Sequence, residues 1–299
     1  MKRKFVEDDA QSNEEHAAKY VYKNYLAKIE QSFGIANLEA KPSANFSFYP
    51  YANDIQKLYF DDYLSKFNTL AKQRFFSQPI TNKNTNKTIG LVVGNGYILS
   101  LLPDLAVDDV ILTDIEPAVH HFILFIKDLI LNTETKDFLQ KRAEIITKIN
   151  HYCGKIKSFK LLSEEDTLAS EITALGDKHF LANEERFNEC KKALQEKDLL
   201  PIKLNILDYK SVKKLAELLE EKGVKISFIN ITNVGDYDRF RVLPTILACL
   251  PLAKEFAIIS TSLISTANRE DLFPRSCFIA NNLEQLEENL SYNYQRNIR

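Results

Sequence analysis

The chain has 299 residues, of which 45% are apolar and 27% charged, and its formal net charge is −2. That length is enough for one large domain or for a core domain with a helical appendage. The near-neutral charge argues against general affinity for nucleic acid or anionic membranes. No apolar run approaches the length of about 20 residues that a membrane span needs, and the polar N-terminus does not resemble a signal peptide.

Four scattered cysteines complete this picture. No two of them form a C-x-x-C pair, so the sequence predicts neither a zinc site nor a disulfide framework. We therefore expect a reduced, cytoplasmic protein without a bound metal.

The N-terminal part is predicted to be helical. Residues 1–15 are charged and aperiodic and are expected to be a disordered tail. Residues 16–80 are expected to form a helical cap, with helices at Ala17–Phe33 and Asp54–Phe76 joined by an aromatic loop at Phe46–Tyr51. The aromatic side chains of this cap suit either a lid over a ligand site or an ordinary core.

Strands and helices alternate after a polar linker that ends near Lys87. The apolar runs predict strands at Thr88–Val93, Asp109–Thr113, Leu200–Leu207, Lys225–Ile231, Glu255–Ser260 and Ser276–Ala280, and a polar edge strand at Tyr292–Ile298. The helical patterns lie at Val119–Leu131, Ser211–Lys222, Asp238–Leu250 and Leu283–Leu290. Residues 133–198 are charged and helical, with breaks at Cys153-Gly154 and Gly176-Asp177, and read as a helical insertion. Its surface is a candidate contact for a protein partner.

This alternation predicts an α/β fold with a doubly wound, mostly parallel sheet over residues 81–299. In such a sheet, ligands bind outside the carboxyl ends of the strands. Four of those ends carry small or polar residues, in the segments Gly94–Tyr97, Asp114–Pro117, Asp208-Tyr209 and Asn230–Tyr237. This coincidence makes that edge of the sheet the candidate ligand site.

The first two of these segments indicate an adenosine-containing cofactor. A G-x-G turn, Gly94-Asn95-Gly96, follows the first strand, and glycines let a backbone turn sharply close to a ligand. Asp114 ends the second strand twenty residues after Gly94, where a carboxylate can accept two hydrogen bonds from ribose hydroxyls.

At this point the chain resembles the class I, Rossmann-like methyltransferases that use S-adenosylmethionine. That family has a glycine-rich first loop, acids after its second and third strands, and an Asn- or Asp-led motif after the fourth. The resemblance implies that the G-x-G turn and Tyr97 face the methionine part of the cofactor and that Asp114 holds the ribose. It further implies that Ile115 packs on adenine and that Asp208, with Tyr209 beside it, accepts a hydrogen bond from the adenine amino group.

The segment after the fourth strand would then lie nearest the methyl group. The candidate catalytic residues there are Asn230, Asn233, Asp236 and Tyr237. Methyl transfer needs alignment and, for an oxygen or nitrogen nucleophile, removal of a proton. Asn230 and Asn233 could equally be turn formers, Asp236 an exposed loop acid and Tyr237 a packing residue.

Two departures from the family pattern leave an alternative open. The family has an acid two residues before the first glycine, where this chain has Val92, and a third glycine where it has Ile98. These favour a degenerate fold that acts through protein–protein interaction, whereas Asp114 and Asp208 favour an enzyme with an unknown small-molecule or protein substrate. The acidic Glu284, Glu287 and Glu288 resemble the export signal of some bacterial type IV secretion effectors, and would also suit an ordinary solvated helix.

The remaining alternatives concern single residues and one other class of enzyme. Asp114 could cap the following helix, and Asp208 could belong to a helix-entry turn. His120 and His121 begin the helix after the second strand and suit a core or surface role better than a ligand contact. A nicotinamide-dependent oxidoreductase would need a third glycine near position 99, where Leu99 stands.

Overall fold

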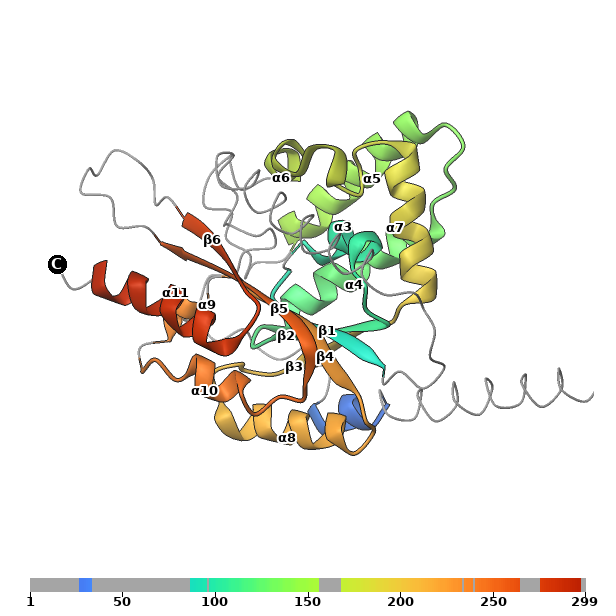
Figure 1. The fold of residues 1–299 in the computed structure, drawn as a ribbon. Helices are drawn as coiled ribbons and strands as arrows, with labels where there is room; N and C mark the ends of the chain where they lie inside the picture. The colour runs from blue at the N-terminus through green and yellow to red at the C-terminus, as the bar shows by residue number, and fades with distance from the viewer. Residues whose placement is uncertain are drawn as a thin grey trace, which may run out of the picture.

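A six-stranded sheet forms the centre of the protein (Figure 1). The computed structural model describes residues 27–33, 87–95, 97–155, 168–232, 234–238, 240–263 and 275–296. The strands are β1 (Thr88–Val93), β2 (Asp109–Asp114), β3 (Leu199–Lys203), β4 (Lys225–Thr232), β5 (Leu252–Leu263) and β6 (Arg275–Ala280). Their spatial order is β3-β2-β1-β4-β5-β6, with every neighbouring pair parallel except β5 and β6. The predicted α/β fold with a mostly parallel sheet is confirmed.

The strand order reverses at β1. The chain moves outward from β1 through β2 to β3 and then returns to β4 on the opposite side of β1. The register aligns Val92 with Leu112 on one side and with Asn230 on the other. The carboxyl ends of β1, β2 and β4 therefore lie side by side.

Helices pack against the sheet through two separate apolar clusters (Figure 1). The first holds side chains of α3 (Ile98–Leu101), α4 (Pro117–Asn132), α5 (Phe138–Lys155), α6 (Leu168–Leu175) and α7 (Glu184–Glu196). The second holds side chains of α8 (Tyr209–Glu220), α9 (Val234–Tyr237), α10 (Leu243–Leu247) and α11 (Leu283–Arg296). Ile89 and Leu91 of β1 belong to the second cluster and Val92 to the first, as expected where successive strand residues point to opposite faces.

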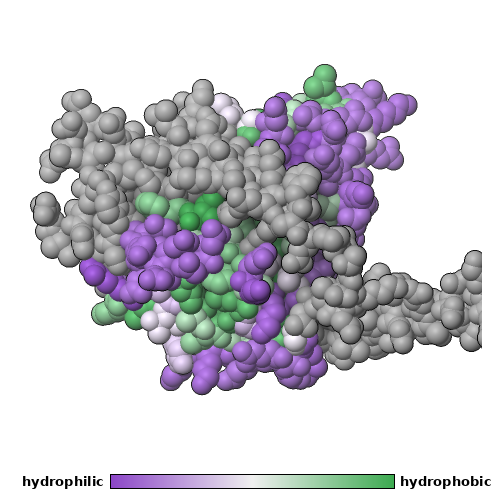
Figure 2. All heavy atoms as spheres, viewed as in Figure 1, coloured by the Kyte–Doolittle hydropathy of each residue, from purple (hydrophilic) through white to green (hydrophobic). Residues whose placement is uncertain are grey.

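The outer surfaces of these helices are polar. Figure 2 shows hydrophilic residues over α8 and α11, with hydrophobic residues between them where α10 and β5 lie in Figure 1. In α8, Val212, Leu215 and Leu219 are buried at helical spacing, which explains why this stretch forms a helix against the sheet. No helix of the described residues is long and apolar enough to cross a membrane.

The insertion consists of α5, α6 and α7, with a 3₁₀ turn at Gly176–Lys178. The predicted break at Gly176 is present, and this residue has φ 51°. The predicted break at Gly154 falls inside α5, which continues to Lys155. Phe138, Phe180 and Phe187 of this region lie in the first cluster together with sheet residues. The insertion therefore shares its core with the sheet.

Several predicted elements differ from the structure, among them β5, which runs from Leu252 to Leu263 rather than from Glu255 to Ser260. β3 ends at Lys203 rather than Leu207, and α8 begins at Tyr209 with Asp208 rather than Ser211 as its N-cap. Of the predicted helix 238–250 only α10 (Leu243–Leu247) is helical, and the short α9 (Val234–Tyr237) precedes it. The predicted edge strand at 292–298 is wrong because α11 continues to Arg296. In the N-terminal cap, residues 27–33 are helical as predicted. The tail, the aromatic loop and the second predicted helix lie outside the described residues.

Candidate functional site

The turn after β1 is built around Gly94. This residue has φ 68°, and its amide donates a hydrogen bond to the Thr113 carbonyl at 2.9 Å. A Cβ on Gly94 would lie 3.6 Å from Oδ2 of Asp114. An L side chain rarely adopts this φ, so the turn needs glycine for conformation and gains close access to the neighbouring carboxylate. Gly96 lies outside the described residues.

Tyr97 completes the turn with an unusual backbone. It has φ 54°, although it carries a side chain, and its ring is buried in the first apolar cluster. Its carbonyl accepts hydrogen bonds from the amides of Ser100 and Leu101, and the Asn95 carbonyl accepts one from Ile98. A non-glycine residue in this region costs about 1–3 kcal/mol and persists where its surroundings impose it. Such residues concentrate at functional sites.

Asp114 stands at the end of β2, beside this turn. Its Oδ1 accepts a hydrogen bond from the Glu116 amide at 2.8 Å. Burial raises the pKa of Asp114 to about 6, against the opposing effect of the Glu116 amide. The carboxylate caps the turn that leads into α4, while Oδ2 remains directed toward Gly94. The alternative in which Asp114 caps α4 is wrong, because Glu116 is the N-cap of that helix, and the role of Asp114 as a ligand acceptor stays a prediction.

Glu116 is the N-cap of α4, which the sequence analysis did not assign. Its Oε1 accepts a hydrogen bond from the Ala118 amide, and Pro117 occupies the first helical position. An acid followed by proline is a signal for a helix start that could have been used. His120, one turn later, is fully buried, and burial lowers its pKa to about 4, so it is neutral. The carbonyls of Asp114 and Ile202 favour its charged form, although neither ring nitrogen reaches hydrogen-bond geometry.

Asp208 has a defined structural role. It accepts hydrogen bonds from the Lys210 amide and the Ser211 hydroxyl, and the bond from Ser211 holds the pKa of Asp208 below its usual value. The prediction that the third strand ends on Asp208 is therefore wrong, because residues 204–207 lie in a turn between the end of β3 and Asp208. A carboxylate has about four acceptor positions, so capping does not prevent a further hydrogen bond.

The segment after β4 is only partly described. Asn230 is fully buried in β4, between Val92 of β1 and Ile259 of β5. Asn233 and the side chain of Asp236 lie outside what the structure describes. Tyr237 ends α9 with its side chain 64% exposed.

Exposed apolar side chains gather in the loops of this edge. The described large apolar residues with high exposure are Ile115 at 49%, Leu139 at 83%, Tyr209 at 47%, Tyr237 at 64% and Phe240 at 86%. All except Leu139 follow the carboxyl end of a strand: β2, β3 or β4. Their shared placement after strand ends makes them candidates for contact with a ligand or a partner. Phe240 was not singled out from the sequence.

The loop that carries Phe240 is held by Asp238. This buried carboxylate accepts hydrogen bonds from the amides of Val242 at 3.0 Å and Leu243 at 2.8 Å. Arg241, next to Phe240, has φ 56°. The exposed Phe240 therefore lies in a turn whose backbone is fixed by the Asp238 carboxylate.

Comparison with known protein families finds no family that matches this chain, and no curated protein matches it either. The interpretation of the site therefore depends on its own geometry.

Proposed function

We propose that the protein is a methyltransferase that uses S-adenosylmethionine and that its sheet is a doubly wound, Rossmann-like one. The left-handed turn at Gly94 beside the Asp114 carboxylate, whose Oδ2 lies 3.6 Å from the position a Cβ would take, is the observation that carries this proposal. Because Gly94 has no side chain, a ligand can approach the backbone there while it donates hydrogen bonds to the neighbouring Asp114 carboxylate. That combination suits the junction of ribose and a linear substituent in an adenosine cofactor.

The remaining strand ends support the same proposal. The exposed side chains of Ile115 and Tyr209 offer apolar surface on the β2–β3 side of the turn, where an adenine ring would pack. Asp208 retains capacity for the adenine amino group. Asn230, which is buried and lies across Val92 of β1 from Leu112, is proposed to lie on the side of β1 toward which the substituent of the ribose would extend.

The cofactor supplies an activated methyl group on a positively charged sulfur, and the chain supplies position. Asp114 binds as a carboxylate, because only the ionised form accepts at both oxygens. Asn230, Asn233, Asp236 and Tyr237 are the residues proposed to orient the acceptor and remove its proton. The acceptor itself is proposed to be a small molecule or a protein.

Calorimetric titration with S-adenosylmethionine, S-adenosylhomocysteine and NAD tests the cofactor. We expect micromolar binding of the first two and none of NAD. Asp114→Ala should weaken S-adenosylhomocysteine binding at least thirtyfold, since losing two hydrogen bonds to a charged group costs about 2 kcal/mol or more. Asp128→Ala, which removes an exposed carboxylate on α4, is the matched control and should bind normally. The proposal is overturned if the folded wild-type protein binds neither S-adenosylmethionine nor S-adenosylhomocysteine, or if it binds NAD more tightly than either.

A second candidate function is a protein that keeps this fold and acts by binding another protein, for example as a secreted effector. The projection of Tyr237 and Phe240 favours it, because aromatic side chains exposed to this extent resemble interface anchors. It predicts no cofactor binding in the titration above.

A further inference from the structure

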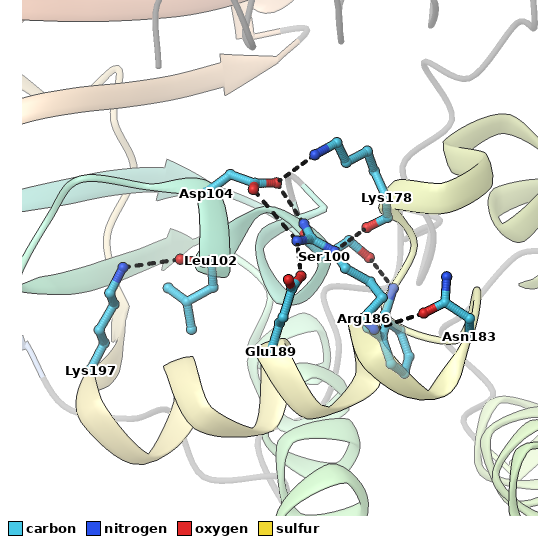
Figure 3. A network of polar contacts seen from close by, with 9 residues as sticks. Ser100, Leu102, Asp104, Lys178, Asn183, Arg186, Glu189 and Lys197 are labelled. Carbon is cyan, nitrogen blue, oxygen red and sulfur yellow. Dashed lines mark hydrogen bonds and ion pairs between the residues drawn. The ribbon is translucent and has the colours of Figure 1, made fainter. Parts of the chain in front are cut away.

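A buried network joins the insertion to the helix that follows the Gly94 turn (Figure 3). The guanidinium of Arg186, on α7, is only 6% exposed. Its Nη2 donates to the Ser100 carbonyl at 2.6 Å and to Oδ2 of Asp104 at 2.6 Å, while Nη1 donates to Glu189 at 2.7 Å. One side chain of the insertion thus holds both α3 and the 3₁₀ turn (Leu102–Asp104) that continues it.

Other hydrogen bonds from the insertion and the residue after α7 also hold α3 and the 3₁₀ turn in place. The Phe180 amide donates to Oγ of Ser100 at 3.1 Å. Lys197, just after α7, donates to the carbonyls of Leu102 at 3.1 Å and Leu105 at 2.6 Å. Cationic donors thus meet the carbonyls at the C-terminal end of α3 and its extension, which is the favourable end for positive charge.

The α3 segment needs such support. It has four residues, and an isolated helix of that length is unstable in water. It begins at Tyr97, whose strained backbone persists only where neighbouring structure imposes it. Only two residues lie between Tyr97 and Ser100, and the Ser100 amide donates to the Tyr97 carbonyl, so a contact that fixes Ser100 also restricts Tyr97.

We propose that Arg186 is a positioning residue, which holds α3 and thereby keeps the backbone of Tyr97, beside the turn at Gly94, in the conformation that binds the ligand. The identity of that ligand rests on the function proposed above. The helical insertion then sets the affinity of a site that Arg186 does not touch.

Amide exchange and S-adenosylhomocysteine titration of the full chain test this proposal. Arg186→Gln removes the positive charge and the planar guanidinium that donates to several acceptors at once. Arg186→Lys keeps the charge but cannot reach two acceptors in a fixed plane. Asn183→Ala is the matched control, because Asn183 caps α7 by accepting from the Arg186 amide, and its loss weakens the start of that helix without removing a contact to α3.

In Arg186→Gln we expect exchange at least tenfold faster at the Ser100 and Leu101 amides, with the Leu91 amide of β1 unchanged. S-adenosylhomocysteine affinity should fall about tenfold. Arg186→Lys should show smaller changes of the same kind, which provides the test if Arg186→Gln does not fold. Asn183→Ala should stay within twofold of wild type in both measurements.

Three outcomes overturn the proposal: unchanged exchange in α3, faster exchange without loss of affinity, or equal effects of Asn183→Ala and Arg186→Gln. If wild type binds no S-adenosylhomocysteine, the proposed function fails, and the exchange comparison alone decides whether Arg186 holds the turn.

Discussion

The two acids of β2, the buried Asp109 and the half-buried Asp114, both have a raised pKa for the same reason. Burial raises the pKa of Asp109 to about 7 and that of Asp114 to about 6, because the charged form loses hydration. They lie at opposite ends of one strand. Asp109, at the amino end, accepts a hydrogen bond from the Asp198 amide at 2.6 Å and has a structural role. Asp114, at the carboxyl end, faces the candidate site.

The elevated pKa of Asp114 makes ligand binding depend on pH. Because binding requires the carboxylate, S-adenosylhomocysteine affinity should be constant above pH 7 and fall about tenfold per pH unit below pH 6. Asp114→Asn should bind weakly at every pH and lose this dependence. Titrations between pH 5 and pH 8 measure both. A pH dependence that persists in Asp114→Asn would assign it to another group.

Asp109 should limit the stability of the protein at high pH. An acid whose folded pKa is raised binds its proton more tightly in the folded state, so its contribution is greatest at low pH and is lost between pH 4 and pH 7. Asp109→Asn keeps an oxygen that can accept from the Asp198 amide and has no charge to bury. At about 1.4 kcal/mol per pKa unit, a rise from 3.8 to about 7 corresponds to about 4 kcal/mol. The neutral amide is a weaker acceptor than the carboxylate and offsets part of this, so we expect a gain on the order of 2–3 kcal/mol at pH 8.

Urea unfolding of Asp109→Asn at pH 8 and pH 5 measures this gain. The stabilisation should be clearly smaller at pH 5, where the native acid is protonated. Equal gains at both values would show that charge is not the cause.

Among the elements, α11 supports the segment after β4. A Cβ on Gly235, in α9, would lie 2.7 Å from Cδ2 of Leu290, which is buried in α11. Glycine at this position is therefore favoured by packing between two helices, because a Cβ would force the end of the Leu290 side chain to shift. The motif around it could have suggested a close approach to a ligand instead.

Gly235→Ala should destabilise the protein by about 1–2 kcal/mol through overpacking. Leu290→Ala alone should cost about 2–3 kcal/mol by leaving a cavity. In the Leu290→Ala background, Gly235→Ala should cost much less, because the methyl group then occupies vacated space. Chemical denaturation of the four proteins of this cycle gives the coupling. Additive effects would indicate that the two residues do not meet.

The sequence predicts elements best where apolar pattern and length agree. The strands β1, β2 and β4 and the helix α8 are found to within two residues, since each is strongly periodic. The end of β3 was missed because Leu204 and Ile206 continue the alternation after the strand hydrogen bonds stop. The Asp238 carboxylate separates α9 from α10, a side-chain effect that periodicity does not contain.

The candidate site was predictable in part for a similar reason. Gly94 and Asp114 belong to local motifs, and the structure brings them together through strand register. Arg186 and Ser100 are 86 positions apart and meet only through tertiary folding. No local pattern indicates such a contact.

For the whole molecule, the shared core predicts a single unfolding transition. The insertion and the sheet contribute to one apolar cluster, so neither has a core of its own to retain. Cys153 and Cys190, buried in α5 and α7, are natural probes, and burial raises the pKa of Cys190 to about 12, which keeps it unreactive when folded. The labelling of each cysteine, mapped by mass spectrometry, should rise at the same urea concentration at which far-ultraviolet circular dichroism shows the midpoint of unfolding. Earlier labelling would mean that the insertion unfolds separately.

The position of β1 at the centre of the sheet has a consequence for synthesis on the ribosome. Its partner β2 emerges soon after it, but β4, which covers its other edge, follows more than a hundred residues later. During that interval a strand that is apolar on both faces presents an unpaired edge, a template for association with other nascent chains. The long insertion prolongs this exposure, so chaperone dependence in the cell should be greater than the stability of the finished protein suggests.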